Sequence, residues 1–139
     1  MPFKGDKLHL PNSLFRIVED VANRSAPELL LTLDKGFSTG TDPYGRPWHP
    51  LAEATLAKGR RPPPLTDTGN MRGSATVTRQ GTDLICNLNT PSEYHQYGTR
   101  KIPIRMVLPN DTEGLPKDWE EILNRQVEEA FARAFGGAL

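Results

Sequence analysis

The sequence predicts an α+β domain, in which helices at both ends of the chain pack with an antiparallel sheet from its middle. Two observations lead to this prediction. Apolar residues recur at helical spacing over residues 14–33 and 118–135, whereas apolar and polar residues alternate in short runs over residues 75–108. The chain has 139 residues, enough for one modest core. We therefore expect residues 1–139 to form a single domain.

Composition points to a loop-rich protein without a global electric field. Thirteen prolines and twelve glycines indicate many irregular connections. Seventeen basic and seventeen acidic residues cancel, so any contact with DNA must be local. The single cysteine, Cys86, excludes an internal disulfide, and no apolar run is long enough to cross a bilayer. We expect a soluble protein made in a reducing cytoplasm.

Two helices are predicted near the N-terminus. The first has an apolar face opposite a polar one and begins at Asn12 or Ser13, either of which can cap it. The tetrapeptide Ser25-Ala26-Pro27-Glu28 resembles a capping box, in which Ser25 caps a new helix and Glu28 bonds back to the backbone. The second helix would then start there and end near Gly36.

A long loop is predicted over residues 38–64, interrupted by a short helix-compatible piece at 51–57. Its last residues, 58–64, combine Lys58, Arg60 and Arg61 with three prolines. We expect this tip to be mobile. It is a solvated linker in the simplest interpretation, a basic contact to DNA in another, and a polyproline ligand of an SH3-like partner in a third.

A meander of three or more antiparallel strands is predicted next. Asp67 or Thr68 can cap a helical turn over 69–73, and two alternating runs on either side of Gln80-Gly81-Thr82 form a β-hairpin. Residues 91–97 can form another helical turn, closed by Gly98. The alternating residues Ile104, Met106 and Leu108 predict a third strand.

The strongest helix signal lies in the C-terminal segment 117–137. An apolar stripe extends from Trp119 to Phe135 along one side of a helix predicted over about 118–135, and Gly136-Gly137 ends it. So large a stripe needs a sheet or a neighbouring subunit to cover it.

Enzyme chemistry is weakly supported. His49 and His95 stand among carboxylates in the sequence, but without the close Cys/His pairs of a zinc site, and Cys86 belongs to an apolar strand where it is a structural thiol. Asp42 and Asp67 have structural roles as a turn initiator and a helix cap. We expect no cofactor and no metal. The alternative is a small metal-dependent hydrolase or nuclease that uses His95, Glu93 and Asp67.

Four short signatures follow one another in the central part of the chain. Each joins a residue that bends the backbone to a large side chain that can anchor the bend. Trp48, held between two prolines, is either an exposed interface anchor or a plug that seals the loop against the core. The signatures are Asp42-Pro43-Tyr44-Gly45-Arg46-Pro47-Trp48, Leu65-Thr66-Asp67-Thr68-Gly69, Tyr94-His95-Gln96-Tyr97-Gly98 and Ile102-Pro103-Ile104-Arg105.

In this order the signatures resemble the phage virion morphogenesis family of Mu-like phages, also described as tail completion proteins. The matching segments are Asp-Pro-x-Gly-x-x-Trp, Leu-x-Asp-Thr-Gly, His-Gln-aromatic-Gly and Pro-x-Arg. The resemblance covers about residues 14–108, and the joint order is more specific than any one motif.

The resemblance implies a structural protein of the virion neck, made in the host bacterial cytoplasm, that is not an enzyme. It implies a homo-oligomeric ring, which we expect to be a hexamer, that joins head and tail and lets DNA pass without sequence specificity. Its other partners would be neck, tail terminator or tail tube proteins, with no membrane contact. Residues 58, 60 and 61 could line the DNA lumen. The residues expected to shape the loops and interfaces are Asp42, Pro43, Tyr44, Gly45, Trp48, Asp67, Gly69, His95, Gln96, Tyr97, Gly98, Pro103 and Arg105.

Overall fold

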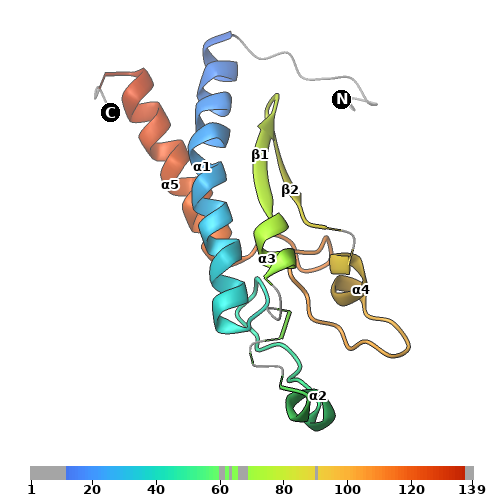
Figure 1. The fold of residues 1–139 in the computed structure, drawn as a ribbon. Coiled ribbons are helices and arrows are strands. Elements are labelled where there is room, and N and C mark those ends of the chain that lie inside the picture. The colour runs from blue at the N-terminus through green and yellow to red at the C-terminus, as the bar shows by residue number, and fades with distance from the viewer. Residues whose placement is uncertain (1–11, 60–61, 63, 66–68, 90, 137–139) are drawn as a thin grey trace.

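The structure is a computed structural model that describes residues 12–59, 62, 64–65, 69–89 and 91–136. It has an α+β fold with a long helix near each end and a β-hairpin between them in sequence (Figure 1). Three short helices complete the described part of the chain. In order, the elements are α1 (Asn12–Thr39), α2 (Glu53–Ala57), α3 (Asn70–Ser74), β1 (Thr76–Gln80), β2 (Asp83–Asn87), α4 (Pro91–Tyr97) and α5 (Lys117–Ala134).

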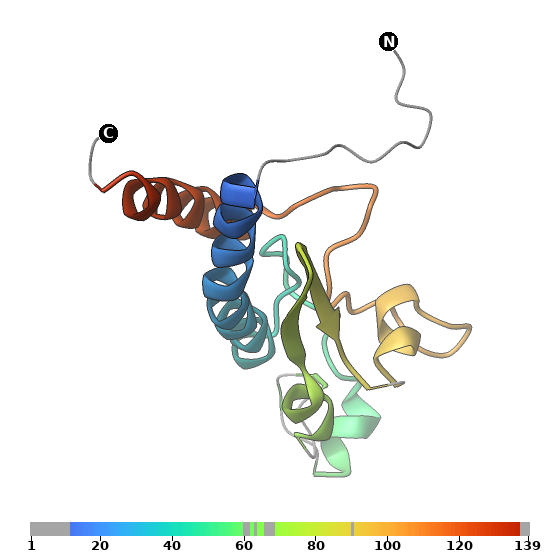
Figure 2. The ribbon, with the colours of Figure 1, turned by 90° about the horizontal axis from the view of Figure 1, so that it is seen from above.

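The central element is α1, which packs against α5 on one side and the hairpin on another (Figures 1 and 2). The two long helices run antiparallel, as two polar contacts show. Near one end Arg133 pairs with Asp20 at 2.8 Å, and farther along Arg125 pairs with Glu28 at the same distance. The α1 helix thus joins the two halves of the fold.

The prediction of two N-terminal helices is wrong, because α1 continues for 28 residues through Pro27. Proline removes one backbone hydrogen bond and is costly inside a helix. Here Pro27 lies on an exposed face, and α5 contacts α1 on both sides of it, at Asp20 and at Glu28. Tertiary packing therefore holds the two segments in one helix, and Glu28 serves α5 instead of a capping box.

The helix also ends later than predicted, at Thr39 instead of near Gly36. Gly40 has the positive φ (68°) that closes a helix, and the N–H groups of Gly40 and Thr41 both donate to the Gly36 carbonyl. A Cβ on Gly36 would lie 3.1 Å from the Thr41 carbonyl oxygen. Gly36 thus permits the chain to fold back over the helix end, and the predicted 38–64 loop starts correspondingly later.

The β-hairpin is confirmed, with Val77 paired to Cys86 and Arg79 to Leu84. These four residues share one face of the ribbon because side chains alternate along a strand. Val77 is buried in the core, and Leu84 and Cys86 pack against it. Burial raises the pKa of the Cys86 thiol, as expected of a structural cysteine.

A third strand is absent from the described residues, so the prediction of a three-stranded meander is wrong. The segment around Met106 is extended but pairs with no strand. Instead its backbone bonds to the side chain of Gln96, which accepts from the N–H groups of Val107 and Leu108 and donates to the Leu108 carbonyl. A side-chain amide thus takes the place of a neighbouring strand.

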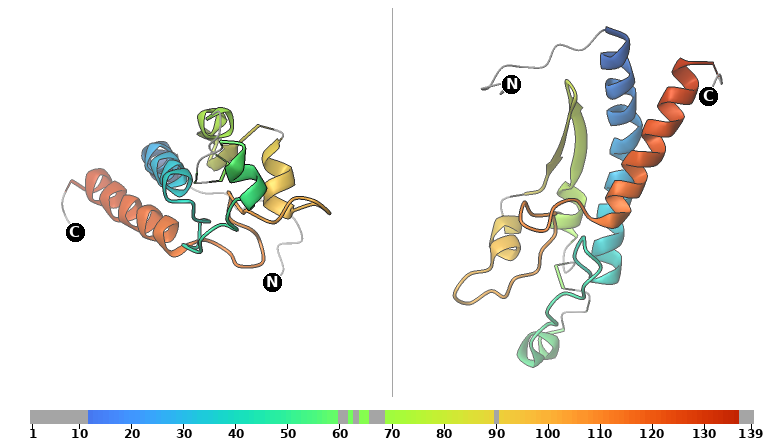
Figure 3. Two further views of the ribbon diagram at one scale, coloured as in Figure 1. Left: turned by 60° about the horizontal axis from the view of Figure 1, so that its bottom comes forward. Right: turned by 180° about the vertical axis from the view of Figure 1, so that it is seen from behind.

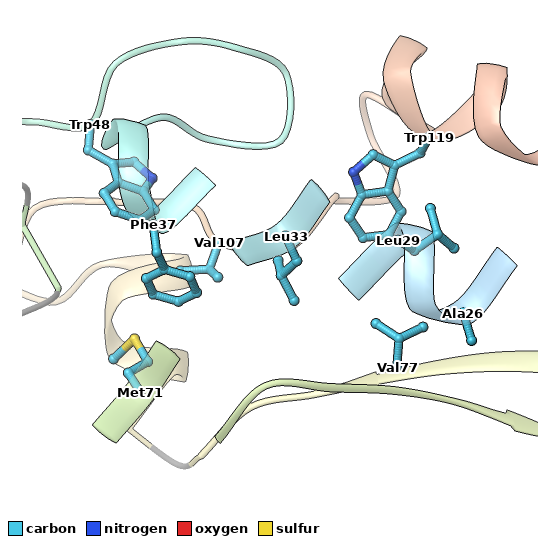
Figure 4. Close-up of a cluster of buried hydrophobic side chains, with 9 residues drawn as sticks. All are labelled: Ala26, Leu29, Leu33, Phe37, Trp48, Met71, Val77, Val107 and Trp119. Atoms are coloured by element: carbon cyan, nitrogen blue, oxygen red, sulfur yellow. The ribbon is translucent and has the colours of Figure 1, made fainter. Parts of the chain in front are cut away.

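The core extends along α1 from the α5 contact to the loops beyond its C-terminus (Figure 4). At the loop end, the ring of Trp48 meets the fully buried Phe37 edge-on, with centroids 5.7 Å apart. At the other end, Trp119 of α5 packs beside Leu29. The cluster contains Ala26, Leu29, Leu33, Phe37, Trp48, Met71, Val77, Val107 and Trp119.

The remaining predicted helices are present with small changes of length. The predicted turn at 91–97 is α4, and the piece predicted at 51–57 is the shorter α2. The C-terminal helix, predicted over about 118–135, runs from Lys117 to Ala134. Gly137, at the end of the predicted segment, lies outside the described residues.

Candidate functional site

The first signature is a closed turn organised by Asp42. One carboxylate oxygen, Oδ1, accepts hydrogen bonds from the backbone N–H groups of Tyr44 and Arg46, both at 2.9 Å. The other, Oδ2, accepts from Arg46 Nε at 2.8 Å. Gly45 supplies the positive φ (87°) that the turn requires. Asp42 is therefore the turn initiator that the sequence predicts, and its carboxylate is fully engaged.

This turn is docked onto the loop that leads into α5. Arg46 forms a two-pronged ion pair with Glu113, with Nη1–Oε1 and Nη2–Oε2 distances of 2.9 and 2.7 Å. The Tyr44 hydroxyl accepts from the Asn110 N–H and contacts the carbonyls of Asn110 and Gly114. The hydrogen bonds that Arg46 donates to Glu113 and Asp42 raise the pKa of its guanidinium. Residues nearly seventy positions apart in sequence are thus joined.

Trp48, at the end of the first signature, is a core residue. Its side chain is 7% exposed, and its indole N–H donates to the Met106 carbonyl at 2.8 Å. Of the two interpretations of Trp48, the structure supports the plug and contradicts the exposed anchor.

Arg105 of the fourth signature connects the first signature to the third. Its guanidinium donates to the carbonyls of His49 (2.6 Å) and Pro50 (2.9 Å), and its backbone N–H donates to the His95 carbonyl (2.7 Å). Arg105 is 8% exposed, and burial lowers its pKa. Among the described residues no carboxylate forms an ion pair with it. In the described part of the chain, backbone carbonyls stabilise this buried cation.

Gln96 and Gly98 of the third signature fix the approach of the fourth. Gln96 holds residues 107 and 108 through its three hydrogen bonds. Gly98 has a φ of 73°, and a Cβ there would lie 2.7 Å from Ile104 Cγ1. The glycine is therefore required both by its backbone conformation and by the close approach of the following loop. Pro103, in that loop, is half-buried.

Three of the four signatures thus form one hydrogen-bonded assembly, which we call the signature block (residues 41–50, 95–98 and 105–114). Of the second signature the structure describes only Leu65 and Gly69, which both have positive φ. Asp67, with its predicted capping role, lies outside the described residues, as do Arg60 and Arg61 of the predicted basic tip. Lys58 is described and is exposed.

Two histidines, His49 and His95, lie in the described part of the chain. No group of three His, Cys, Asp or Glu side chains there could hold a metal ion, and the alternative that used His95 and Glu93 also needs Asp67. Burial, and then the charge of Arg105, lowers the pKa of His95. Its Nδ1 is buried without a hydrogen-bond partner among the described residues. Its backbone carbonyl accepts a hydrogen bond from the Arg105 N–H.

The surface beside the signature block is hollowed. One hollow, the basic groove, has a volume of about 590 Å³ and is lined by His49, His95, Arg100, Lys101, Ile102 and Arg105 among others. A second, the apolar hollow, has a volume of about 460 Å³ and is lined by Trp48, Leu56 and Pro64 among others. The two share Pro50 and Leu51. Tyr97 and Ile104 are close in sequence to residues that line the basic groove, and they are 76% and 59% exposed.

The structure thus divides the predicted site residues into two groups. Asp42, Trp48, Gln96, Gly98 and Arg105 build the signature block, whereas Tyr97 is free to contact a partner. Sequence analysis missed the roles of Arg46 and Glu113 in docking the turn. Nothing in the sequence spacing could have revealed that pair, because it depends on the position of the α5 loop.

Comparison with known proteins identifies no relative. No family model, no curated protein and no solved structure matches this chain. In the described residues, no helix is both long enough and apolar enough to pass through a lipid bilayer.

Proposed function

We propose that this protein is a structural component of a phage neck, a tail completion protein that forms a homo-oligomeric ring between head and tail. Its partners are further copies of itself and a neighbouring neck, tail terminator or tail tube protein. DNA passes through the ring without being read. The protein performs this role by docking, with no bond made or broken.

The observation that carries the proposal is the ordered set of signatures together with their mutual contacts. The motif residues are far apart in sequence, yet they meet at the segment 105–107. Trp48 and Gln96 bond to its backbone, and Arg105 belongs to it. A chance resemblance would not require the matched residues to depend on one another. The contacts therefore support the interpretation that the motifs mark a shared fold, which places exposed loops for assembly.

The surface properties also support docking over catalysis. Large apolar side chains are exposed at Tyr97, Ile104 and Phe135, and such residues favour protein interfaces. Formal charges cancel over the whole chain, which suits a ring whose lumen must not retain DNA. We expect six copies, joined by a head-to-tail contact that is repeated by rotation until the ring closes.

A joining assay tests the proposal. Particles of the parent phage assembled without this protein should accumulate as filled heads and separate, complete tails. Adding the purified protein to that extract should restore joined, infectious particles, and images of them should show its density at the collar. Light scattering of the purified protein mixed with its tail partners should give a molar mass that contains several copies of the monomer.

Two results would contradict the proposal. In one, heads and tails join and infect without the protein. In the other, the protein stays monomeric beside its tail partners and joined particles carry no density for it. Heat-denatured protein serves as the inactive control, because its failure shows that restoration needs the folded protein.

A further inference from the structure

The outer face of α5 carries an apolar stripe that the rest of the described chain does not cover. The helix buries Trp119, Gln126 and Ala130. A different row, spaced four residues apart, leaves Val127 40% and Phe135 50% exposed, and Phe135 stacks on Phe131 rather than on another element. We call Val127, Phe131 and Phe135 the α5 stripe, since Leu123, one turn before Val127, packs against the core instead.

The charges beside the α5 stripe are acidic. Glu120 lies two turns before Val127 on the same side of the helix. Glu128 lies about one turn before Phe131. In the part of the chain that the structure describes, neither glutamate forms an ion pair. The two α5 arginines are engaged elsewhere, since Arg125 pairs with Glu28 and Arg133 with Asp20. The stripe is therefore apolar with an acidic border.

The hollows beside the signature block have the complementary pattern. The residues that line the basic groove include Arg100, Lys101 and Arg105 and no acidic side chain. Arg105 has no carboxylate partner among the described residues, and neither do Arg100 and Lys101. The adjoining apolar hollow presents Leu51 and Leu56. An apolar surface and a cationic one thus lie side by side, as the α5 stripe and its acidic border do.

The elements that carry the α5 stripe and the basic groove lie on opposite sides of α1 (Figure 2). The α5 helix lies on one side of α1, whereas α4 and the loop after it lie on the far side, beyond the hairpin (Figures 2 and 3). One chain cannot bring them together. Two different, complementary surfaces on opposite sides of a subunit are what a head-to-tail contact requires.

We infer that neighbouring copies associate by seating the α5 stripe of one copy in the apolar hollow of the next, with Glu120 and Glu128 directed at the basic groove. The occupant of the hollows is a second copy of this chain. The contact supplies carboxylates for Arg100 and Lys101, which form no ion pair among the described residues. This inference rests on the proposed ring and specifies which surfaces close it.

Charge reversal tests the inference. A stripe variant carries Glu120→Lys and Glu128→Lys, and a groove variant carries Arg100→Glu and Lys101→Glu. In each, like charges meet across the contact, so the concentration at which half of the protein is assembled should rise at least about tenfold. Arg16→Glu, at an exposed position of α1 outside both surfaces, is the matched control and should assemble like the wild type. Circular dichroism checks that all variants fold.

Recombining the charges gives the decisive measurement. A chain with all four substitutions again has opposite charges across the contact, so its assembly should recover toward the wild-type concentration. An equimolar mixture of the stripe and groove variants should also assemble, because each then meets a partner of opposite sign. Light scattering after size exclusion measures both.

Different outcomes separate this inference from the proposed function. If both variants assemble like the wild type, or the fourfold variant stays dissociated, the ring remains possible but these are not its contacts. If the groove variant assembles normally and instead loses salt-sensitive binding to a random-sequence DNA duplex, the groove binds phosphate and the inference is wrong. A wild-type protein that stays monomeric beside its tail partners removes the ring itself.

Discussion

At Gln96 a single side-chain amide replaces the edge of a strand. Its oxygen accepts from the N–H groups of Val107 and Leu108 at 2.8 and 2.9 Å, and its nitrogen donates to the Leu108 carbonyl at 2.7 Å. The segment that the sequence predicts as a third strand is satisfied in this way. Gln96, which sequence analysis names among the residues that shape loops and interfaces, thus holds the backbone of a distant segment.

Removing this amide should destabilise the fold without changing its surface. Gln96→Ala leaves two backbone N–H groups and one carbonyl without their partner, and we expect a loss of about 2 kcal/mol in the free energy of unfolding. Urea unfolding followed by circular dichroism measures it. Gln80→Ala, at an exposed position of β1, is the matched control and should change stability by less than about 0.5 kcal/mol. Equal stability of both variants would show that the Gln96 contacts contribute nothing.

Trp48 is expected to contribute more to stability than to association. Trp48→Ala removes a buried ring from its edge contact with Phe37 and from its bond to the Met106 carbonyl. Such truncations cost about 3–5 kcal/mol. Trp48→Phe keeps most of the packing, so thermal unfolding should place it between the alanine variant and the wild type. A Trp48→Ala protein with wild-type stability that fails to join tails would restore the interpretation of Trp48 as an interface anchor.

Among the elements, α1 is the one on which the others are assembled. It contacts α5 along one side and the hairpin along another, and its C-terminus supports the first signature. The α5 contact is edged by charged pairs. Hydrogen bonds from Arg133 and then Arg24 lower the pKa of Asp20, and those from Gln126 and then Arg125 lower the pKa of Glu28.

These pairs predict how the α1–α5 contact responds to pH. The ordinary pKa is 3.8 for Asp20 and 4.5 for Glu28, and in the folded protein the pKa of each carboxyl lies below that value. The unfolded chain therefore binds more protons near pH 4, so the stabilisation is complete above about pH 5 and is lost as the pH falls through the folded pKa values. Because both groups are near the surface, we expect only about 0.5 kcal/mol per pair.

The measurement compares thermal unfolding at pH 7 and pH 3. A double variant, Asp20→Asn with Glu28→Gln, should lose less stability between these pH values than the wild type does. Glu53→Gln, an exposed glutamate of α2 with no ion pair among the described residues, is the control and should retain the wild-type difference. An unchanged difference in the double variant would show that the two pairs do not contribute.

For the whole molecule, one shared helix implies one cooperative unit. The cluster of buried side chains extends from Trp119 on α5 to Trp48 in the signature block, through residues of α1 (Figure 4). Neither half keeps a covered core once α1 is lost. We therefore expect the monomer to unfold in a single transition.

The two tryptophans make this testable. Trp119→Phe leaves Trp48 as the fluorescent reporter of the signature block, and far-UV circular dichroism reports mainly on the helices. In this variant the urea midpoint measured by fluorescence should coincide with the one measured by circular dichroism. Separate midpoints, with the fluorescence change at lower urea, would show that the signature block opens independently of the helices.

Local pattern predicted most of the elements of this fold. The apolar spacing of α5, the alternation of the hairpin and the turn chemistry of α4 are properties of neighbouring residues, and each is present where it was expected within a few positions. The structural thiol of Cys86 and the turn-forming carboxylate of Asp42 were also predicted. Such features follow from nearby residues alone.

The sequence by itself determined the α+β class, the hairpin, the C-terminal helix and the positions of the bends, because these depend on periodicity and on the backbone preferences of glycine and proline. Only the tertiary structure decided that α1 passes through Pro27, that Gln96 replaces a strand and that Trp48 is buried. Each of those outcomes depends on a contact between distant residues, and the energy of such a contact outweighs the local preference.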